Sequence, residues 1–365
     1  MNALLIGIGA AGNKAAVEAV ESGIVALEDC IIINSTSKDF PEDFHGRKII
    51  LSPNDKGCGK ERNIANEFAR NMISEGRLNL DVSSYTTVII CTSVEGGTGS
   101  GASPLIAKFF KKVCNRNVHI IAFTGFEDDV RGLSNTIEFF KEMEDDLIVQ
   151  TIRNASYLNQ ANGNKFRAEE LANKEMCRRI AILTGKDFIV SSQNIDDTDI
   201  LKVSNTAGYM TIEEKYLNKM LETQDDFKKV VKNMIYNSHS IQSKNPGAIR
   251  IGIILNIDPG SEDAIDYTFT DIKNAYGNPY ECFLQKQWDG KKEYIQWIVS
   301  GMQMPIDEIE EIYNRYIESS NRVQKNSDAF FATIGKMEMD ETNNKFDMIK
   351  PVEQGMSIES FLKGQ

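Results

Sequence analysis

Two glycine-rich segments of this 365-residue chain have the residue types that bind phosphate. The first reads GIGAAGN at residues 7–13, and the second reads EGGTGSG at residues 95–101. Glycine lets a backbone amide approach a phosphate closely, and the N-terminus of a following helix adds a favourable electric field. Both segments stand between an apolar run and a segment with helical periodicity. Together they predict a long polyphosphate held by more than one helix N-terminus.

The first segment contains the GxGxxG pattern of dinucleotide-binding proteins, but the next apolar run does not end as that pattern requires. A dinucleotide site needs an acidic residue there to hold the ribose, and here Ile33 is followed by Asn34, Ser35 and Thr36. An NAD-dependent oxidoreductase is therefore kept only as the alternative from a different functional class. A P-loop is excluded, because residues 57–60 (GCGK) lack both the first glycine and the hydroxyl residue.

A third candidate for chemistry is the polar segment NIDDTD at residues 194–199. Clustered carboxylates in a loop can hold the Mg²⁺ on a phosphate and polarise an attacking water molecule. Asp and Asn are equally the usual residues of turns and helix N-caps, so the segment alone is compatible with either role.

The order of the predicted elements puts the two glycine-rich segments at strand-to-helix turns. Strands and helices alternate over the first 124 residues, which is typical of a doubly wound parallel sheet of the α/β class. A long helix at 165–184 follows and could connect two domains. The predicted strands are 3–8, 30–33, 48–51, 87–91 and 118–123, and the predicted helices are 13–21, 62–75, 103–114 and 133–144.

The C-terminal part of the sequence predicts a smaller second α/β domain. Strands are predicted at 248–257, 280–287 and 293–300, with a helix at 262–276, and Asp289-Gly290 indicates a hairpin between the last two strands. A further helix opens at Pro305, with acidic residues in its first turns. We therefore expect a nucleotide-binding domain at 1–164, a connecting helix at 165–190, a second domain at 191–304, a C-terminal helix at 305–325 and a flexible tail at 326–365.

Composition excludes several functional classes. A formal net charge of -12 removes the basic surface that binding to a nucleic-acid backbone requires, so direct DNA binding is not expected. The six cysteines include no CxxC pair and the three histidines stand alone, so neither a metal site nor a disulfide framework is predicted. No apolar stretch approaches the ~20 residues of a membrane span, and the N-terminal sequence lacks the basic region of a signal peptide. We expect a cytoplasmic protein with no membrane partner.

The combination of these motifs resembles the tubulin/FtsZ superfamily. Residues 96–101 match most of its GGGTG[ST]G signature, and residues 9–13 are similar to the GxxGN of the first tubulin loop. Residues 126–131 match the FExxxR segment of FtsZ. Residues 194–199, with Gly208-Tyr209 downstream, match the NxDxxD loop of FtsZ. The matches follow the order in which the family has these motifs.

The resemblance implies a GTPase that binds GTP or GDP with Mg²⁺ and assembles head to tail with copies of itself. Its active site would be shared between adjacent subunits, because Asn194, Asp196 and Asp199 of one subunit would act on the nucleotide of the next. Glu127 and Arg131 would contact the ribose and base. The other implied contacts are to phosphate from Gly9, Ala10, Ala11, Gly12, Asn13, Gly96, Gly97, Thr98, Gly99 and Ser100, from Asn34 in the second nucleotide loop, and to guanine from Asn154, Phe166 and Glu170.

Three positions depart from the family pattern. Glu95 stands where the family has the first glycine of the signature, which brings a like charge beside the phosphates unless the side chain turns outward or meets Mg²⁺. The third nucleotide loop, usually rich in glycine, contains Lys60 and Arg62, either of which could reach a γ-phosphate. Glu170 stands where the family usually has Asn or Asp, and its carboxylate can still accept hydrogen bonds from guanine.

Within the superfamily, the acidic helix from Pro305 and the tail after it are more similar to the plasmid and phage TubZ proteins than to FtsZ. TubZ filaments move DNA by binding TubR, an adaptor that itself binds DNA, and an acidic chain suits that division of labour. The resemblance implies DNA segregation with the adaptor bound through the C-terminal helix or tail. The alternative is an FtsZ-type role in cell division, because residues 358–363 (IESFLK) resemble the IPxFLR end of FtsZ without its proline.

Overall fold

One sheet runs through the whole of the computed structural model, which describes residues 2–78, 80–186, 197–241 and 243–334. The sheet has ten strands in the order β3-β2-β1-β4-β5-β6-β7-β10-β8-β9. The first six strands in the chain pair in parallel with their neighbours. They are β1 (Ala3–Ile8), β2 (Cys30–Asn34), β3 (Arg47–Ile50), β4 (Thr87–Ser93), β5 (Asn117–Thr124) and β6 (Ile148–Arg153).

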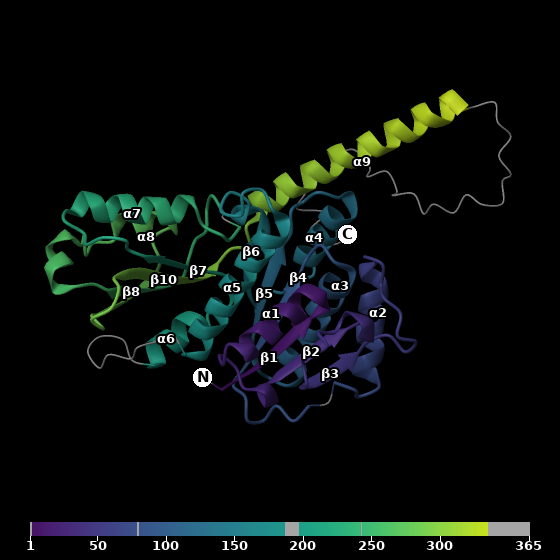
Figure 1. Cartoon of the computed structure of the whole chain (residues 1–365), viewed down its shortest axis with the longest axis horizontal. Coiled ribbons are helices and arrows are strands. Elements are labelled where there is room, and N and C mark those ends of the chain that lie inside the picture. Colours follow the sequence, from purple (N-terminus) through teal and green to yellow (C-terminus); the bar gives the residue numbers. More distant parts are fainter. Residues whose placement is uncertain (1, 79, 187–196, 242, 335–365) are drawn as a thin grey trace.

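Helices cover both faces of this parallel half of the sheet (Figure 1). Side chains alternate along β1, so that Leu4 and Ile6 join the core on one face while Leu5 joins the core on the other. This arrangement confirms the predicted doubly wound α/β fold. One face carries α1 (Gly9–Glu21) and α5 (Lys165–Thr184), and the other carries α2 (Arg62–Ser74), α3 (Gly97–Lys108) and α4 (Val130–Lys141).

The strand order places a topological switch point at β1. This strand lies between β2 and β4, so successive βα units are added on its two sides. Ligands of such sheets bind at the carboxyl ends of the strands beside the switch point. Both glycine-rich segments stand there, because one follows Ile8 at the end of β1 and the other follows Ser93 at the end of β4.

The sheet continues into the C-terminal half of the chain through β7 (Gly208–Tyr216), which pairs with β6 at Ile148 and Val149. The sequence did not predict β6, β7 or the helix α7 (Gln224–Tyr236). The remaining elements are α6 (Asp197–Ser204), β8 (Arg250–Asn256), α8 (Thr270–Ala275), β9 (Glu281–Gln287), β10 (Tyr294–Met302) and the short 3₁₀ helices at Leu27–Asp29, Ser37–Asp39, Asn154–Tyr157 (η4) and Pro259–Ala264 (η5).

The predicted hairpin between the last two strands is wrong. The chain does turn after β9, but β10 runs antiparallel between β7 and β8, and β9 pairs with β8 at the edge of the sheet. Burial explains this order, since seven of the nine residues of β10 are buried whereas five of the seven residues of β9 are partly or fully exposed. The more apolar strand takes the central position.

The predicted helix at 262–276 is also wrong over its middle. It is divided into η5 and α8, and residues 265–269 between them are not helical. The Asp266 carboxylate accepts hydrogen bonds from both the amide and the hydroxyl of Thr268, which offers the backbone an alternative to the helix. Phe269 then has a φ of 50° and its side chain is buried.

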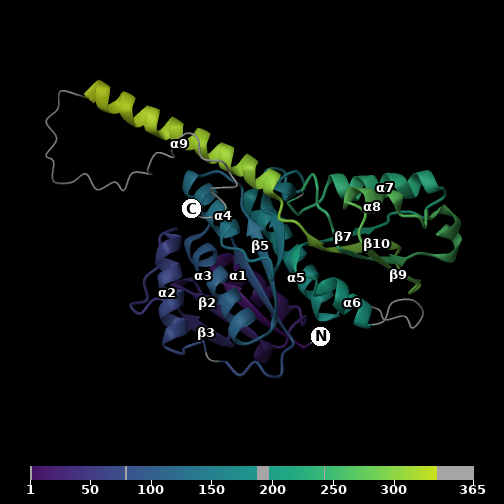
Figure 2. The same cartoon turned by 180° about the vertical axis from the view of Figure 1, so that it is seen from behind.

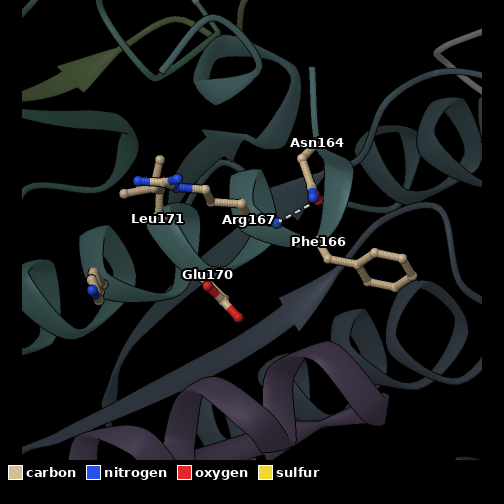
Figure 3. A pocket seen from close by; sticks show the side chains of 6 residues that line it. Asn164, Phe166, Arg167, Glu170 and Leu171 are labelled. Carbon is tan, nitrogen blue, oxygen red and sulfur yellow. Dashed lines mark hydrogen bonds between the residues drawn. The ribbon is translucent and has the colours of Figure 1, made fainter. Parts of the chain in front are cut away.

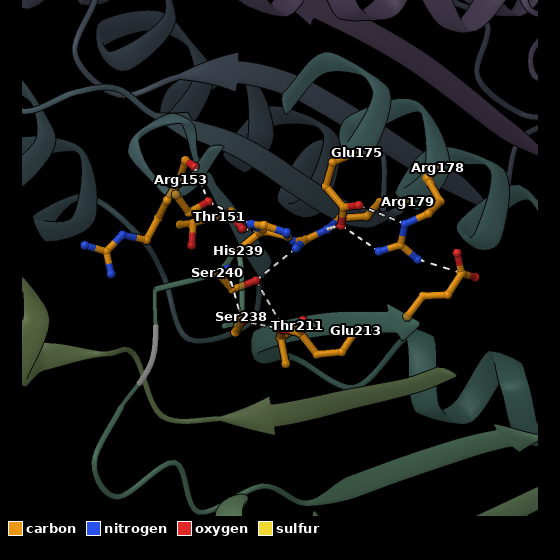
Figure 4. Close-up of polar contacts among 12 residues, drawn as sticks. Thr151, Arg153, Glu175, Arg178, Arg179, Thr211, Glu213, Ser238, His239 and Ser240 are labelled. Carbon is orange, nitrogen blue, oxygen red and sulfur yellow. Dashed lines mark hydrogen bonds and ion pairs between the residues drawn. The ribbon is translucent and has the colours of Figure 1, made fainter. Parts of the chain in front are cut away.

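Helix α5 has the bounds of the predicted helical pattern, 165–184, and joins the two halves of the molecule, but it ends before residue 190, to which the expected connecting helix extended. Its N-cap Asn164 accepts from the amide of Arg167, and Gly185 ends it with a φ of 74°. Near its middle, Arg179 donates to Glu175 at 2.8 Å and to Ser240 at 3.0 Å, and Ser240 bonds Thr211 of β7 at 2.8 Å. Figure 4 shows this buried polar network between α5, β7 and the segment 238–240.

The C-terminal helix α9 (Ile306–Ile334) is longer than predicted. The sequence prediction ended it at residue 325, but residues 326–334 contain no glycine or proline that would stop a helix. Its N-terminal turns pack beside α4, and its remaining turns extend away from the body in both views (Figure 1, Figure 2). The predicted tail therefore begins inside this helix, and its part from residue 335 onward lies outside the described residues.

Across the part of the chain that the structure describes, no helix combines the length and apolarity of a membrane span.

Candidate phosphate and guanine site

The helices α1 and α3 both begin at the carboxyl edge of the sheet without a side-chain cap. Their N-cap residues are Ile8 and Gly96, and neither side chain bonds a backbone amide. By contrast, Asp129 caps α4 and Asn164 caps α5 through side-chain oxygens. The first amides of α1 and α3 are thus left to bind another acceptor, and the two helix dipoles favour a negatively charged one.

Tight packing between the two loops explains their glycines. Gly9 has a φ of 78°, and a Cβ atom there would lie 3.1 Å from the amide nitrogen of Gly99. A Cβ atom at Gly99 would lie 2.6 Å from Thr92 Oγ1 and 2.8 Å from the carbonyl oxygen of Ser93. At Gly97 it would lie 2.8 Å from the backbone of Lys60. The backbone at Gly9 is therefore within contact distance of the backbone at Gly99. The first amides of α1 and α3 thus lie close to each other.

A cavity of about 350 Å³ adjoins these loops. It is bounded by the first turn of α1, the loops after β4 and β5, the 3₁₀ helix η4 and the second and third turns of α5. Its volume lies within the range of small-molecule sites. The lining residues are Ala10, Ala11, Lys14, Ser93, Glu95, Phe123, Gly125, Phe126, Asn154, Glu169 and Asn173.

Three asparagines near the carboxyl ends of β1, β2 and β6 each carry a buried polar atom without a hydrogen-bond partner, and one of them, Asn154, lines the cavity. Asn13 and Asn34 each lack a partner for Nδ2, and Asn154 lacks one for Oδ1. The other amide atom is used in two of them, since Asn13 Oδ1 accepts from the amide of Ile33 and Asn34 Oδ1 accepts from the amide of Ser35. An unpaired buried polar atom costs ~1–3 kcal/mol, so a polar ligand at this position would stabilise the fold.

Glu95 does not turn outward. Its carboxylate lines the cavity, accepts from the amide of Glu127 at 2.8 Å, and would collide with a Cβ atom at Gly125. Burial raises the pKa of Glu95, and the neighbouring carboxylates at residues 127–129 act in the same direction. A polyphosphate in this cavity therefore meets a carboxylate, which favours a cation between the two.

The two basic candidates for a γ-phosphate are engaged elsewhere. Lys60 pairs with Asp129 at 2.9 Å. Arg62 is buried, with two 2.9 Å hydrogen bonds to Glu142 and one of 3.1 Å to the carbonyl oxygen of Ser100. Instead, the basic residue of the cavity lining is Lys14, which sequence reasoning missed although it follows directly after Asn13.

Two further residues expected at the ribose and base are held in ion pairs. Arg131 pairs with Glu61 at 2.7 Å. The Glu127 carboxylate pairs with Arg315 of α9 and is 7% exposed. Phe126, the first residue of the same motif, does line the cavity.

On α5, the cavity is lined by Glu169 and Asn173, one helical turn apart, rather than by Phe166 and Glu170. The last two line a separate surface hollow of about 490 Å³ with Asn164, Arg167, Leu171 and Lys174 (Figure 3). Phe166 is 80% exposed there. Asn173 is 4% exposed, which only the structure shows. The sequence signal for this face was an asparagine beside the apolar positions of the predicted helix.

Only residues 197–199 of the predicted catalytic segment 194–199 are among the described residues. Asn194 and Asp196 are outside the described residues, and Asp199 lies in α6, where Lys202 pairs with it at 3.1 Å. Figure 1 shows α6 beyond the C-terminal end of α5, whereas the cavity is at the N-terminal end. Asn173, the cavity-lining residue furthest along α5, is 11 residues or ~17 Å before the end of the helix at Thr184, and Asp199 lies in the element beyond that end, so it is not part of the cavity of its own chain.

The sequence profile of the Tubulin/FtsZ family, GTPase domain, matches residues 2–162. These residues are a tubulin/FtsZ-family GTPase domain. They contain β1 to η4, and hence the uncapped N-termini of α1 and α3 and most of the cavity lining. The family resemblance inferred from the motifs is thereby confirmed, and it takes the place of the NAD-dependent alternative.

Similarity to individual proteins extends over more of the chain than the match to the family profile does. The cell division protein FtsZ of Mycoplasmopsis pulmonis is 26% identical over 213 residues, which are 57% of this chain and 53% of that protein. A GTPγS-form protofilament of TubZ from Bacillus thuringiensis serovar israelensis has a TM-score of 0.71 at 16% identity, covering 89% of this chain and 94% of that one. GTPγS-bound CetZ2 of Haloferax volcanii, also a protofilament, has a TM-score of 0.70 at 15% identity, covering 89% and 100%. This chain therefore spans about half the length of the curated relative and shares the whole fold with the solved structures.

Proposed function

We propose that this protein is a GTPase that assembles head to tail into filaments. The observation that carries the proposal is the cavity beside two uncapped helix N-termini in a tubulin/FtsZ-family GTPase domain, with buried asparagine atoms that lack partners. The similar TubZ and CetZ2 structures, which are GTPγS-form and GTPγS-bound protofilaments, support both the nucleotide and the mode of assembly.

In this proposal the polyphosphate lies across the N-termini of α1 and α3. The first amides of the two helices, including those of Ala10, Thr98 and Gly99, donate to phosphate oxygens, and Lys14 adds a positive charge. Mg²⁺ bound to the phosphates would neutralise their charge, and it usually takes one or two carboxylates besides phosphate oxygens, which Glu95 fits.

The base end of the cavity favours guanine over adenine. Asn154 presents an unpaired acceptor, Oδ1, and Glu169 and Asn173 add further acceptors beside it. Guanine offers an N1–H and an exocyclic amino group that these acceptors match, whereas adenine has an acceptor at N1. We therefore assign the base contacts of α5 to Glu169 and Asn173 instead of Phe166 and Glu170.

Hydrolysis in this proposal requires a second subunit. Asp199 lies beyond the C-terminal end of α5 and the cavity lies at its N-terminal end, so Asp199 would act on the nucleotide of the next subunit in a head-to-tail filament. Asp199→Ala should keep GTP binding and assembly while hydrolysis falls ~10²-fold, the scale of a lost acid/base or water-positioning group.

The test is the GTPase rate as a function of protein concentration, together with light scattering and electron microscopy. The rate per subunit should rise with concentration for the native chain and stay low for Asp199→Ala, whose filaments should persist. A matched control is Lys202→Gln, which removes the partner of Asp199 without removing the carboxylate. A rate per subunit that does not depend on concentration would rule out the shared site.

Within the family we favour segregation of plasmid or phage DNA through a DNA-binding adaptor, as in TubZ. The net charge of -12 and the length of α9, 29 residues, support a chain that leaves DNA contact to a partner. FtsZ-type cell division is the alternative, and FtsZ of Mycoplasmopsis pulmonis is among the relatives. Truncation after Ile334 should leave GTP-dependent assembly intact and abolish adaptor-dependent recruitment of DNA to sedimented filaments. Full recruitment by the truncated chain would instead place adaptor binding on the remaining surface.

A further inference from the structure

Helix α9 is attached to the body by its first three turns. Ile309 and Ile312 are 3% and 2% exposed and belong to the large core, against which Tyr313 and Tyr316 also pack. The helix packs beside α4, which follows the loop at residues 125–129. Docking of α9 thus depends on a surface directly next to the nucleotide cavity.

Polar contacts hold the same turns in register. The Asp307 carboxylate accepts from the amide of Lys244 at 2.7 Å, and Glu308 pairs with Arg153 at 3.0 Å. Two turns further along the helix, Arg315 pairs with Glu127. Since residues 308 and 315 are seven positions apart, both ion pairs lie on one face of α9.

Glu127 connects α9 to the cavity through two different groups. Its side chain binds Arg315, while its backbone amide donates to Glu95 Oε1, which lines the cavity. It also has a φ of 58°, a left-handed conformation that non-glycine residues rarely adopt, so surrounding contacts must hold it there. The two residues before it, Gly125 and Phe126, belong to the cavity lining.

Three elements outside the loop each supply one cation to its carboxylates. Lys60 pairs with Asp129, Lys165 of α5 pairs with Asp128, and Arg315 of α9 pairs with Glu127. Of the three carboxylates, that of Glu127 is the most buried at 7% exposure, against 53% and 43% for Asp128 and Asp129. Loss of Arg315 would leave a buried negative charge close to Glu95, which is unfavourable unless the loop moves.

We propose that Arg315 is a positioning residue for the nucleotide cavity, acting through the Glu127 side chain on the loop that holds Glu95 and Phe126. The proposal rests on the proposed GTP site. Docking of α9 and occupancy of the cavity are then linked, and because linkage is reciprocal, a partner that displaces α9 changes nucleotide affinity. The position of the C-terminal helix and the affinity of the cavity for nucleotide are in this way coupled.

The test compares Arg315→Gln with Glu308→Gln in the full chain. Both variants remove one ion pair on the same face of α9, but only the first reaches the cavity loop. In the nucleotide-free protein, hydrogen exchange of the 125–131 segment should rise at least ~5-fold in Arg315→Gln and stay within ~2-fold in Glu308→Gln. The dissociation constant of labelled GTP should rise ~5-fold or more in Arg315→Gln alone, and Arg315→Lys should restore part of it.

Each outcome decides between the possibilities. Equal effects of the two variants, or an unchanged 125–131 segment in Arg315→Gln, overturn the positioning role. Faster exchange with unchanged GTP affinity overturns the linkage to the cavity. If the native chain binds no GTP, the proposed function fails, while the nucleotide-free exchange still decides whether Arg315 positions the loop. If Arg315→Gln fails to fold, the double variant Glu127→Gln/Arg315→Gln, which leaves no unpaired carboxylate at residue 127, should fold and show the faster exchange. Native-like exchange of the 125–131 segment in that double variant would overturn the proposal.

Discussion

Gly9 is the first residue of α1 and Gly99 is the third residue of α3, 90 positions further along the sequence, and a Cβ atom on the first would lie 3.1 Å from the amide nitrogen of the second. This contact puts the N-termini of α1 and α3 side by side at the switch point of the sheet. The glycines therefore allow the two helix N-termini to pack together, and they also allow a phosphate to approach the backbone.

Gly99→Ala should weaken GTP binding at least ~10-fold. The new methyl group would lie 2.6 Å from Thr92 Oγ1 and 2.8 Å from the carbonyl oxygen of Ser93, so the loop must move and its amides lose their alignment. Gly23→Ala is a control for a glycine whose replacement strains the backbone without a clash, because Gly23 has a φ of 69°, which Gly99 does not share, and has open space around it just beyond the C-terminal end of α1. It should cost ~1 kcal/mol of stability and leave the affinity unchanged. Titration with a labelled GTP distinguishes the two.

Asn173→Ala should reduce GTP affinity ~10-fold and affect ATP little, because it removes a cavity-lining group that the proposed function assigns to guanine. Glu170→Gln should change GTP affinity less than ~2-fold, because Glu170 lines the neighbouring hollow. Competition of GTP and ATP for each variant is the measurement. The opposite pattern, with Glu170→Gln impaired and Asn173→Ala normal, would return the base contact to Glu170.

Glu95→Gln should increase GTP affinity several-fold at low Mg²⁺ and reduce the dependence of affinity on Mg²⁺. The native carboxylate is a like charge beside the phosphates unless a cation lies between them, and its raised pKa already reflects burial with other carboxylates nearby. Glu28→Gln, at an exposed carboxylate before the start of β2, is the control for net charge. An affinity that is weaker in Glu95→Gln at every Mg²⁺ concentration would contradict a repulsive role.

His239 should make the fold sensitive to acid. Its Nδ1 lies 2.8 Å from Ser156 Oγ and its ring stacks on Tyr157 at 4.1 Å, and burial lowers its pKa to about 4. Because this value lies below the ~6.5 of an unfolded histidine, the neutral ring contributes stability that is complete above pH ~6.5 and is lost as the pH falls towards 4. Between pH 7 and pH 5 the loss should be ~1–2 kcal/mol. Urea unfolding of the native chain and of His239→Gln at both pH values measures it, and equal losses in the two proteins would exclude His239 as the cause.

Local sequence determined strands β1 to β5 of the parallel half of the sheet, the helical pattern over residues 165–184 and the position of both glycine-rich segments after a strand. Each of these is a short-range signal: an apolar run of strand length, a 3.6-residue periodicity, or a glycine pair after a strand. Such signals lie within a window of a few residues, so they can be interpreted without knowing what packs against these residues.

Tertiary structure decided which elements are neighbours and which face of each helix is used. The insertion of β10 between β7 and β8, the choice of Asn173 over Glu170, and the ion pair between Arg315 and Glu127 all join segments distant in the sequence. Several apolar strands and several charged side chains were equally eligible for each of these contacts on local grounds. Only the burial of the most apolar strand in the middle of the sheet, and the pairing of a buried carboxylate with the cation that reaches it, select one arrangement.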